Sequence, residues 1–397
     1  MQKQAIDDLA VLGGPRLFAT PISTSNLVRP DFDKFLEYSS IFYGQHRYTN
    51  NGPVVQKLEQ RLAEFHQAKH CIALANGFWA IVLAIKCLAI PARTEIVMPS
   101  LTYRRLADIA AWTNLKPRFC DVDAHTLSMT PQTVASCLTD DTALVLAVHP
   151  IVNCCDVEGI AEVATRAGTP IVFDAVESVY ETVEGRKIGS FGHVECFSLH
   201  ASKLINGFEG GYITTDDADL AYRLSIQRGF GFFGQDNVIE LGINAKLNEI
   251  HASMALASLD DLEDQVIRNR TRYEQYRKAL RPVRGLRLLE FDESEKTSYK
   301  NIVVELTDRW PLTRERTLDI LHAEGALARP YYAPPLHKKA MSYPFVPANL
   351  PITDDLAERY MLLPCGHFVS QADIDAVCAL FSFIENDAGA IRTRFPS

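Results

Sequence analysis

The residues best suited to chemistry lie where short apolar runs end. The run Ile-Val-Phe ends in Asp174, and Glu177 follows three residues later. A second run, Glu195–Ser198, leads within five residues to Lys203. Such runs indicate buried strands of an α/β fold, in which ligands bind at the carboxyl ends of the strands. We therefore expect these polar side chains to meet in one site.

A third run ends just before Asn76 and Gly77, and an apolar stretch follows. A strand that passes directly into a helix offers backbone N–H groups to an anion such as phosphate. Pyridoxal 5′-phosphate needs a lysine for a Schiff base, an acid that keeps its pyridine nitrogen protonated, and a phosphate site. A lone lysine is usually a surface residue and an aspartate after a strand is often a helix cap. The prediction of this cofactor therefore depends on the three features occurring together.

One glycine-rich segment resembles a dinucleotide-binding motif but does not predict such a site. Residues 229–234 read GFGFFG and match the dinucleotide pattern GxGxxG. That pattern binds a pyrophosphate only where a strand precedes it and a helix follows it. Here a helix-like stretch, 219–228, comes first and polar residues follow. We predict a mobile Gly/Phe loop and no nicotinamide dinucleotide site.

The elements that must position these residues alternate along the first half of the chain. Apolar runs separated by helix-like stretches predict an α/β fold with a mostly parallel sheet covered on both faces. An amphipathic helix begins at Pro53, a residue favoured in the first helical turn. The expected strands are 71–75, 95–98, 118–122, 143–148, 171–174, 195–198 and 211–215.

The last third of the chain has a different pattern. Apolar residues from Leu259 to Leu280 repeat at heptad-like spacing and predict one long helix that leads out of the large domain. Beyond it we expect a strand at 299–306 and helices at 314–324, 354–362 and 370–384, which together form a small α+β domain. The predicted division is a large domain with an N-terminal arm, 1–258, and a linking helix with the small domain, 259–397.

Composition narrows the classes of protein. The 397 residues are too many for one compact core. A net charge of −9 argues against nucleic acid and anionic membranes as partners. The most apolar stretch, 71–92, is interrupted by polar residues and reads as a buried helix, and the first ten residues lack a secretory pattern. Nine scattered cysteines without a CxxC pair favour reduced thiols, no metal site and a cytoplasmic protein.

From residue 21 to about 383 the sequence resembles the DegT/DnrJ/EryC1/StrS family of PLP-dependent sugar aminotransferases. The stretches that carry the resemblance are YTNNGPVVQKLEQRLAEF, EIVMPSLTY, PRFCDVDAHTLSMTP, VFDAVES, HVECFSLHASKLINGFEGGYITTDD, RGFGFFGQDNVIELGINAKLNEIHASMALASLDDLE and ARPYYAPPLH. The SLHASK and FEGG blocks resemble most closely the branch that aminates 3-keto nucleotide sugars. The resemblance implies PLP fold-type I, like aspartate aminotransferase, with a seven-stranded sheet and active sites shared within a homodimer. It also implies amino transfer, with glutamate as donor, to a keto group of a nucleotide-linked deoxysugar.

The resemblance to this family implies a role for individual residues of the sequence. The resemblance implies that Lys203 forms the Schiff base and that Asp174 faces the pyridine nitrogen. Glu177 matches a position near the phenolic oxygen, and Tyr103 matches an aromatic residue that stacks on the ring, unless it only packs in the core. The implied phosphate contacts are Ser198, the amides of Gly77 and Phe78, and Asn244 from the neighbouring subunit. Implied on the substrate side are His200, Arg329, Tyr331 and His337, for each of which packing or capping is an equal alternative.

Several positions depart from the family. Phe78 replaces a small or hydroxyl residue, Tyr180 replaces a glycine, and HPIVN at 149–153 replaces a His-aromatic-Gly segment. Arg104 and Arg105 lie where small or apolar residues are usual. They are either solvated surface residues or a guanidinium site for a substrate phosphate or carboxylate.

The departures leave two alternative functions open. One is a PLP enzyme of the same family that acts on a non-sugar or carrier-bound ketone. The other is a non-catalytic PLP-binding sensor or regulatory protein, since a fold alone does not fix function. The retained Lys203 disfavours the dehydratase branch of the family, which lacks that lysine.

Overall fold

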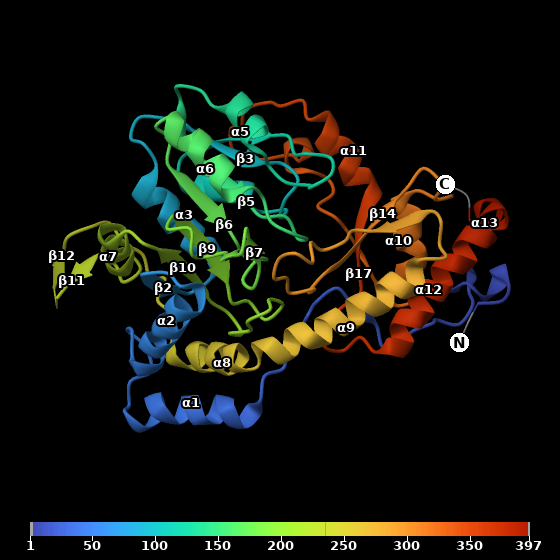
Figure 1. Cartoon of the computed structure of the whole chain (residues 1–397), viewed down its shortest axis with the longest axis horizontal. Coiled ribbons are helices and arrows are strands. Elements are labelled where there is room, and N and C mark those ends of the chain that lie inside the picture. The colour runs from blue at the N-terminus through green and yellow to red at the C-terminus, as the bar shows by residue number, and fades with distance from the viewer. Residues whose placement is uncertain (1–2, 235, 396–397) are drawn as a thin grey trace.

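The structure is a computed structural model that describes residues 3–234 and 236–395. Its centre is a seven-stranded sheet in the order β2-β10-β9-β6-β5-β3-β4 (Figure 1). The strands are β2 His70–Leu74, β3 Glu95–Pro99, β4 Lys116–Cys120, β5 Thr142–Val148, β6 Ile171–Asp174, β9 Val194–Ser198 and β10 Gly211–Thr215. Only β10 is antiparallel to its neighbours, β2 and β9. The predicted mostly parallel seven-stranded sheet is confirmed.

Both faces of the sheet are covered by helices because side chains alternate between two apolar clusters. In β5, Val145 and Ala147 join one cluster, whereas Leu144 and Leu146 join the other. The first cluster includes residues of α2 Pro53–His66, α5 Pro131–Cys137, α6 Val157–Arg166 and α8 Glu249–Asp260. The second includes residues of α3 Gly77–Leu88, α4 Ala107–Trp112 and α7 Ala218–Gln227. The N-terminal helix α1, Phe32–Gly44, packs on α8.

The single helix predicted over 259–280 is wrong in one respect. The chain leaves helical geometry at Asp261 (φ −97°, ψ 8°), so that α8 ends at Asp260 and α9 spans Leu262–Leu280. The carboxylate of Asp261 accepts a hydrogen bond from the Asp31 N–H (2.8 Å) and pairs with Lys34 (2.7 Å). This contact with the start of α1 accompanies the break, which periodicity alone does not reveal.

The long helix α9 leads to a four-stranded antiparallel sheet in the order β13-β14-β17-β16 (Figure 1). Its strands are β13 Leu286–Leu288, β14 Ile302–Leu306, β16 Arg329–Pro330 and β17 Tyr360–Leu363, and its helices are α10 Arg314–Ala323, α11 Pro351–Arg359, α12 Gln371–Asn386 and α13 Ala388–Arg394. The helix predicted at 354–362 ends at Arg359, because Tyr360–Leu363 pair with β14. The N-terminal arm reaches this part of the chain, where β1 (Ile22–Ser23) pairs with β15 (Ala326–Leu327).

The GFGFFG segment lies after α7, as its context predicts. Part of it forms β11 (Phe232–Phe233), which pairs with β12 (Asn237–Val238) in a hairpin that projects from the sheet at the left of Figure 1. A second small hairpin joins β7 (Thr182–Val183) and β8 (Arg186–Lys187). The short 3-10 helices are Ile6–Asp8, Ala10–Leu12 and Leu336–Lys338. Within residues 3–234 and 236–395, every helix is too short or too polar to span a bilayer.

Candidate active site

The site is built at the carboxyl edge of the sheet, where β6 ends in Asp174 and β9 ends in Ser198. The helix α3 begins beside them at Gly77, and the Asn76 side chain caps it by accepting a hydrogen bond from the Trp79 N–H (2.9 Å). A Cβ on Gly77 would lie only 3.1 Å from the Cβ of Ser198. The missing side chain therefore lets the start of α3 approach Ser198. Together they form a cradle with the N–H groups and positive dipole end that bind anions.

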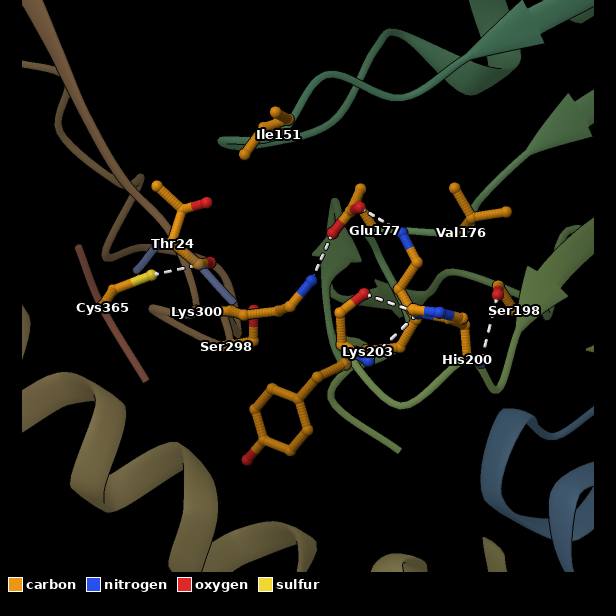
Figure 2. A network of polar contacts seen from close by, with 12 residues as sticks. Thr24, Ile151, Val176, Glu177, Ser198, His200, Lys203, Ser298, Lys300 and Cys365 are labelled. Carbon is orange, nitrogen blue, oxygen red and sulfur yellow. Dashed lines mark hydrogen bonds and ion pairs between the residues drawn. The ribbon is translucent and has the colours of Figure 1, made fainter. Parts of the chain in front are cut away.

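Lys203 lies in the turn that follows β9, where its backbone N–H donates to the carbonyl of His200 (2.8 Å). Its side chain is largely buried, and Nζ forms an ion pair with Oε1 of Glu177 (Figure 2). Glu177 follows β6 by three residues, so two adjacent strands of the sheet deliver the two partners. The sequence-predicted Lys203, Asp174, Glu177, Ser198 and Gly77 are thus brought to one edge.

Asp174 is 3% exposed. Burial raises the pKa of its carboxyl group to about 6, although the hydrogen bond from the Val176 N–H (3.1 Å) and the charge of Lys203 oppose this rise. Within the described residues it forms no ion pair. A buried carboxylate without a counter-ion is costly, and a cationic ring nitrogen would satisfy it.

A second lysine, Lys300, enters the site and was missed from the sequence. It precedes β14 in the C-terminal part of the chain, is 5% exposed, and pairs through Nζ with Oε2 of Glu177 (2.5 Å). Figure 2 shows Glu177 between the two lysines. Burial raises the pKa of Glu177, but Lys203 and Lys300 together lower it to about 2. A lone lysine before an apolar run carries no sequence signal for such a contact.

The two aromatic residues predicted at the site lie in different environments. Tyr103 is 51% exposed, so it is available to a ligand and does not simply pack in the core. Tyr331 is buried, and its hydroxyl accepts a hydrogen bond from the Ile151 N–H (3.4 Å). Burial and the charge of Glu177 raise the pKa values of both Tyr331 and its neighbour Tyr332, and the charge of Asp174 adds to the rise at Tyr332. The sequence singled out Tyr331 and not Tyr332.

The remaining residues predicted on the substrate side lie in other environments. His200 is exposed, with Nδ1 2.9 Å from the hydroxyl of Ser202. His337 is buried, with Nδ1 2.7 Å from Oγ of Ser100 and Nε2 3.1 Å from Asp354. Arg329 is exposed on the edge strand β16. The contacts of His337 favour the packing alternative, and those of His200 a local role in its turn, whereas Arg329 lies at the surface.

Two further predicted contacts lie at the surface of the subunit. Asn244 is exposed, and its amide oxygen accepts a hydrogen bond from Lys246 (2.8 Å). Phe78, in the first turn of α3, is half-buried and meets Trp79 edge-on. A side chain without a polar atom leaves only the backbone N–H of Phe78 to contact an anion.

Arg104 and Arg105 follow Tyr103 and are exposed. They line a cavity of about 270 Å³ together with Asp108, Trp112, Lys339 and Tyr343. Arg105 pairs with Asp108 (2.5 Å), whereas the Arg104 guanidinium has no ion-pair partner in the described part of the chain. This wall of the cavity therefore has an excess of positive charge.

The other departures are structural. Tyr180 is buried and its hydroxyl donates to Glu263 on α9 (2.7 Å). His149 is buried and stacked on Phe173, with ring centroids 5.9 Å apart, and burial lowers its pKa to about 3. Tyr180 thus ties the segment after β6 to α9, and the His149 N–H donates to the Asp174 carbonyl (3.1 Å).

The fold and the edge of polar residues define an α/β enzyme of the aminotransferase class. Residues 35–382 match the model of the DegT/DnrJ/EryC1/StrS aminotransferase family, and the chain belongs to this family. The predicted fold and enzyme class are confirmed.

Three comparisons illustrate the family. A solved structure of DesI in the presence of its TDP-sugar product is 32% identical, with a TM-score of 0.91, and the match covers 99% of this chain and 100% of that one. A UDP-2-acetamido-2-deoxy-3-oxo-D-glucuronate aminotransferase of Pseudomonas aeruginosa is 29% identical over 83% of this chain and 90% of its own length. A dTDP-4-amino-4,6-dideoxy-D-glucose transaminase of Shigella dysenteriae is 26% identical over 79% and 85%. The names of these relatives include both 3-oxo and 4-amino sugars.

Proposed function

We propose that this aminotransferase uses pyridoxal 5′-phosphate to transfer the amino group of glutamate to a keto group of a nucleotide-linked deoxysugar. The observation that carries the proposal is that Lys203, paired with Glu177, lies at the same edge of the sheet as the buried Asp174 and the start of α3 at Gly77. The relatives support the substrate class, because their names describe nucleotide-sugar transaminases. Their division between 3-keto and 4-keto sugars leaves the keto carbon to experiment.

The residues present fit this cofactor. Asp174 is a buried carboxylate that forms no ion pair with any described residue, the start of α3 offers N–H groups to a phosphate, and Lys203 offers an amine. Tyr103 has an exposed face on which a ring can stack. We assign these residues, with Ser198 and Glu177, to a cofactor site in the proposed 1–258 domain.

Bound pyridoxal 5′-phosphate supplies an electron-poor ring that accepts the electron pair left when a proton leaves the substrate carbon. Asp174 stabilises positive charge on the ring nitrogen. Lys203, once its amine is free, takes up that proton as a general base and returns it. Glu177 holds the lysine amine through the carboxylate that already pairs with it.

We further propose that the active unit is a homodimer. Large apolar side chains are exposed on and beside the hairpin β11–β12, namely Phe230, Phe232, Phe233, Val238, Ile239 and Leu241, the last 91% exposed. A patch of this kind marks an interaction site, and a second copy of the chain supplies a matching one by two-fold symmetry. Asn244 lies on the segment that follows this patch, and in the dimer its amide reaches the phosphate site of the partner subunit.

The test begins with protein reconstituted with the cofactor. Glutamate should convert bound cofactor to its amine form, which is followed by absorbance, and Lys203→Ala should abolish the conversion. The amine form is then offered 3-keto and 4-keto nucleotide sugars and, as controls, non-sugar ketones. Turnover of a non-sugar ketone alone would assign a different substrate. Cofactor binding without any conversion by glutamate would assign a sensor.

A further inference from the structure

Glu177 is shared between two lysines that come from distant parts of the chain. Lys203 follows β9, whereas Lys300 lies 123 residues beyond Glu177, just before β14. Lys300 is the more deeply buried of the two, with 6% of its side chain exposed against 17% for Lys203. Figure 2 shows that the two ammonium groups approach opposite oxygens of the one carboxylate. Each oxygen is therefore occupied by a cation.

The two lysines differ in what the reaction asks of them. Under the proposed function, Lys203 must lose its positive charge whenever its amine acts as a base. A carboxylate as buried as Glu177 would then tend to take up a proton, because burial favours its neutral form. Asp174, the other acid nearby, has a negative charge that also raises this tendency. Lys300 is the cation that remains in contact with Glu177 throughout.

We propose that Lys300 is a positioning residue that keeps Glu177 ionised and fixed while the charge of Lys203 changes. This role rests on the proposed function, because it requires Lys203 to cycle between charged and uncharged forms. It explains how a carboxylate can occupy this place beside a cofactor oxygen without leaving an uncompensated negative charge. Lys300 also joins the segment before β14 to the loop after β6, at the carboxylate that contacts Lys203.

The charges of Lys300, Glu177 and Lys203 predict in which direction a titration midpoint moves when Lys300 is replaced. A purely structural role of Lys300 would predict no such direction. In Lys300→Met, Lys203 is the one of the two cations that remains beside Glu177, so loss of a proton from the Lys203 nitrogen leaves the carboxylate uncompensated. Protonation of the nitrogen that joins Lys203 to the cofactor becomes easier. The midpoint pH of the cofactor's absorbance change should then rise by about one unit or more, the size of shift that a close charge produces. Lys300→Arg keeps the charge and should stay near the wild-type midpoint.

The matched control is Ser298→Ala. Like Lys300, Ser298 precedes β14. Its hydroxyl donates to Glu181 in the segment after β6 (2.6 Å), and it does not contact Glu177 or Lys203. Its loss should lower thermal stability without moving the midpoint. An equal midpoint in wild-type and Lys300→Met protein would overturn the proposal. So would an upward shift of the same size in Ser298→Ala.

A double-variant cycle tests whether Lys300 acts through Glu177. Glu177→Gln alone strands the charge of Lys300 and should lower the midpoint by about one unit. Adding Lys300→Met to Glu177→Gln should raise the midpoint by less than Lys300→Met raises it in the wild type, because the carboxylate through which Lys300 acts is absent. If Lys300→Met alone fails to fold, Lys300→Gln replaces it in both backgrounds. An equal rise in the two backgrounds would mean that Lys300 acts on Lys203 directly, and this would contradict the proposal.

A measurement on cofactor-free protein separates this inference from the proposed function. Only the uncharged amine of Lys203 reacts with a neutral acylating reagent, and peptide mass spectrometry reports the extent of labelling. At pH 7, Lys300→Met should slow labelling of Lys203 about tenfold, and Lys300→Arg should not. Unchanged labelling refutes the role of Lys300 whatever the enzyme does. Slowed labelling in a protein that glutamate cannot convert refutes the proposed function instead.

Discussion

Asp174 ends β6 and Glu177 follows it by three residues, yet the pKa values of their carboxyl groups are shifted in opposite directions. Burial raises the pKa of Asp174 to about 6, whereas two lysines overcome the effect of burial at Glu177 and lower its pKa to about 2. One carboxylate is thus compensated by the protein itself. The other forms no ion pair among the described residues, and under the proposed function a cationic ring nitrogen would compensate it.

The first prediction concerns Asp174→Asn in cofactor-free protein. Because the folded-state pKa lies above the ordinary value of 3.8, ionisation of Asp174 opposes folding at any pH above that value, and the cost reaches its full size above pH 6. The variant should be more stable than the wild type at pH 8, by up to about 3 kcal/mol, and equal to it near pH 4. Thermal unfolding at both pH values measures this.

The control is Asp319→Asn on the exposed face of α10, which should change stability little at either pH. With cofactor bound the order should reverse, because Asp174 then has its cation. Loaded Asp174→Asn should lose most of its rate in the glutamate half-reaction. A loaded variant that transaminates at the normal rate would mean that the ring nitrogen lies elsewhere.

The second prediction is that borohydride reduction attaches the cofactor to Lys203. Lys300 is the informative competitor, since its amine contacts the other oxygen of the same carboxylate. Peptide mapping should find the label on Lys203 and none on Lys300. Lys203→Ala should bind the cofactor without covalent attachment and should lose turnover. A label on Lys300 in the wild type would exchange the roles of the two lysines.

The fold was largely predictable from the sequence because a parallel sheet buries both faces. Its strands are continuous apolar runs, and Asp174 and Lys203 are conspicuous because they come where two such runs end. Lys300 had no such signal. Its contact with Glu177, 123 residues earlier in the chain, forms where the segment before β14 meets the segment after β6, as Ser298 also meets Glu181.

Two smaller differences from the predicted structure also arise from contacts between residues distant in the sequence. In the segment 354–362 the apolar residues fit a helix, but Tyr360–Leu363 are drawn into β17 by pairing with β14, a partner more than fifty residues earlier. Tyr331 was predicted on the substrate side, but it is buried and its ring lies 6.2 Å from that of Tyr360, a residue of β17 that sequence alone does not place beside it.

The third prediction is a pH dependence centred on Glu177. Its folded-state pKa of about 2 lies below the ordinary 4.5, so its ion pairs stabilise the fold above pH 4.5 and are lost as the pH falls toward 2. Glu177→Gln should therefore be destabilised by about 3 kcal/mol at pH 7. The gap to the wild type should close between pH 4.5 and 2, as followed by denaturant unfolding. A gap that is constant with pH would show that the carboxylate charge is not what matters.

The fourth prediction separates dimer formation from cofactor retention. Leu241→Asp places a charge in the exposed apolar patch and should shift the protein toward monomer in light scattering. Asn244→Ala removes one polar contact, a small part of an interface, so it should leave the dimer intact while bound cofactor is lost faster on dialysis. A fully active monomer at assay concentration would contradict the shared site.

The last prediction distinguishes two adjacent arginines. Arg105 is already paired with Asp108, whereas the guanidinium of Arg104 is unpaired among the described residues and lies on the same cavity wall as Lys339. A guanidinium binds a phosphate or carboxylate through two hydrogen bonds, and a charged hydrogen bond contributes about 1.5–3 kcal/mol. Arg104→Ala should therefore raise the KM for the keto substrate about tenfold or more. Its glutamate half-reaction should be unchanged, because only the second substrate has lost a contact.

Arg105→Ala is the matched control and should have the smaller effect on that KM. Equal effects of Arg104→Ala on both half-reactions, measured by single-turnover absorbance, would place Arg104 near the cofactor instead, and no effect on either would return it to the solvated surface.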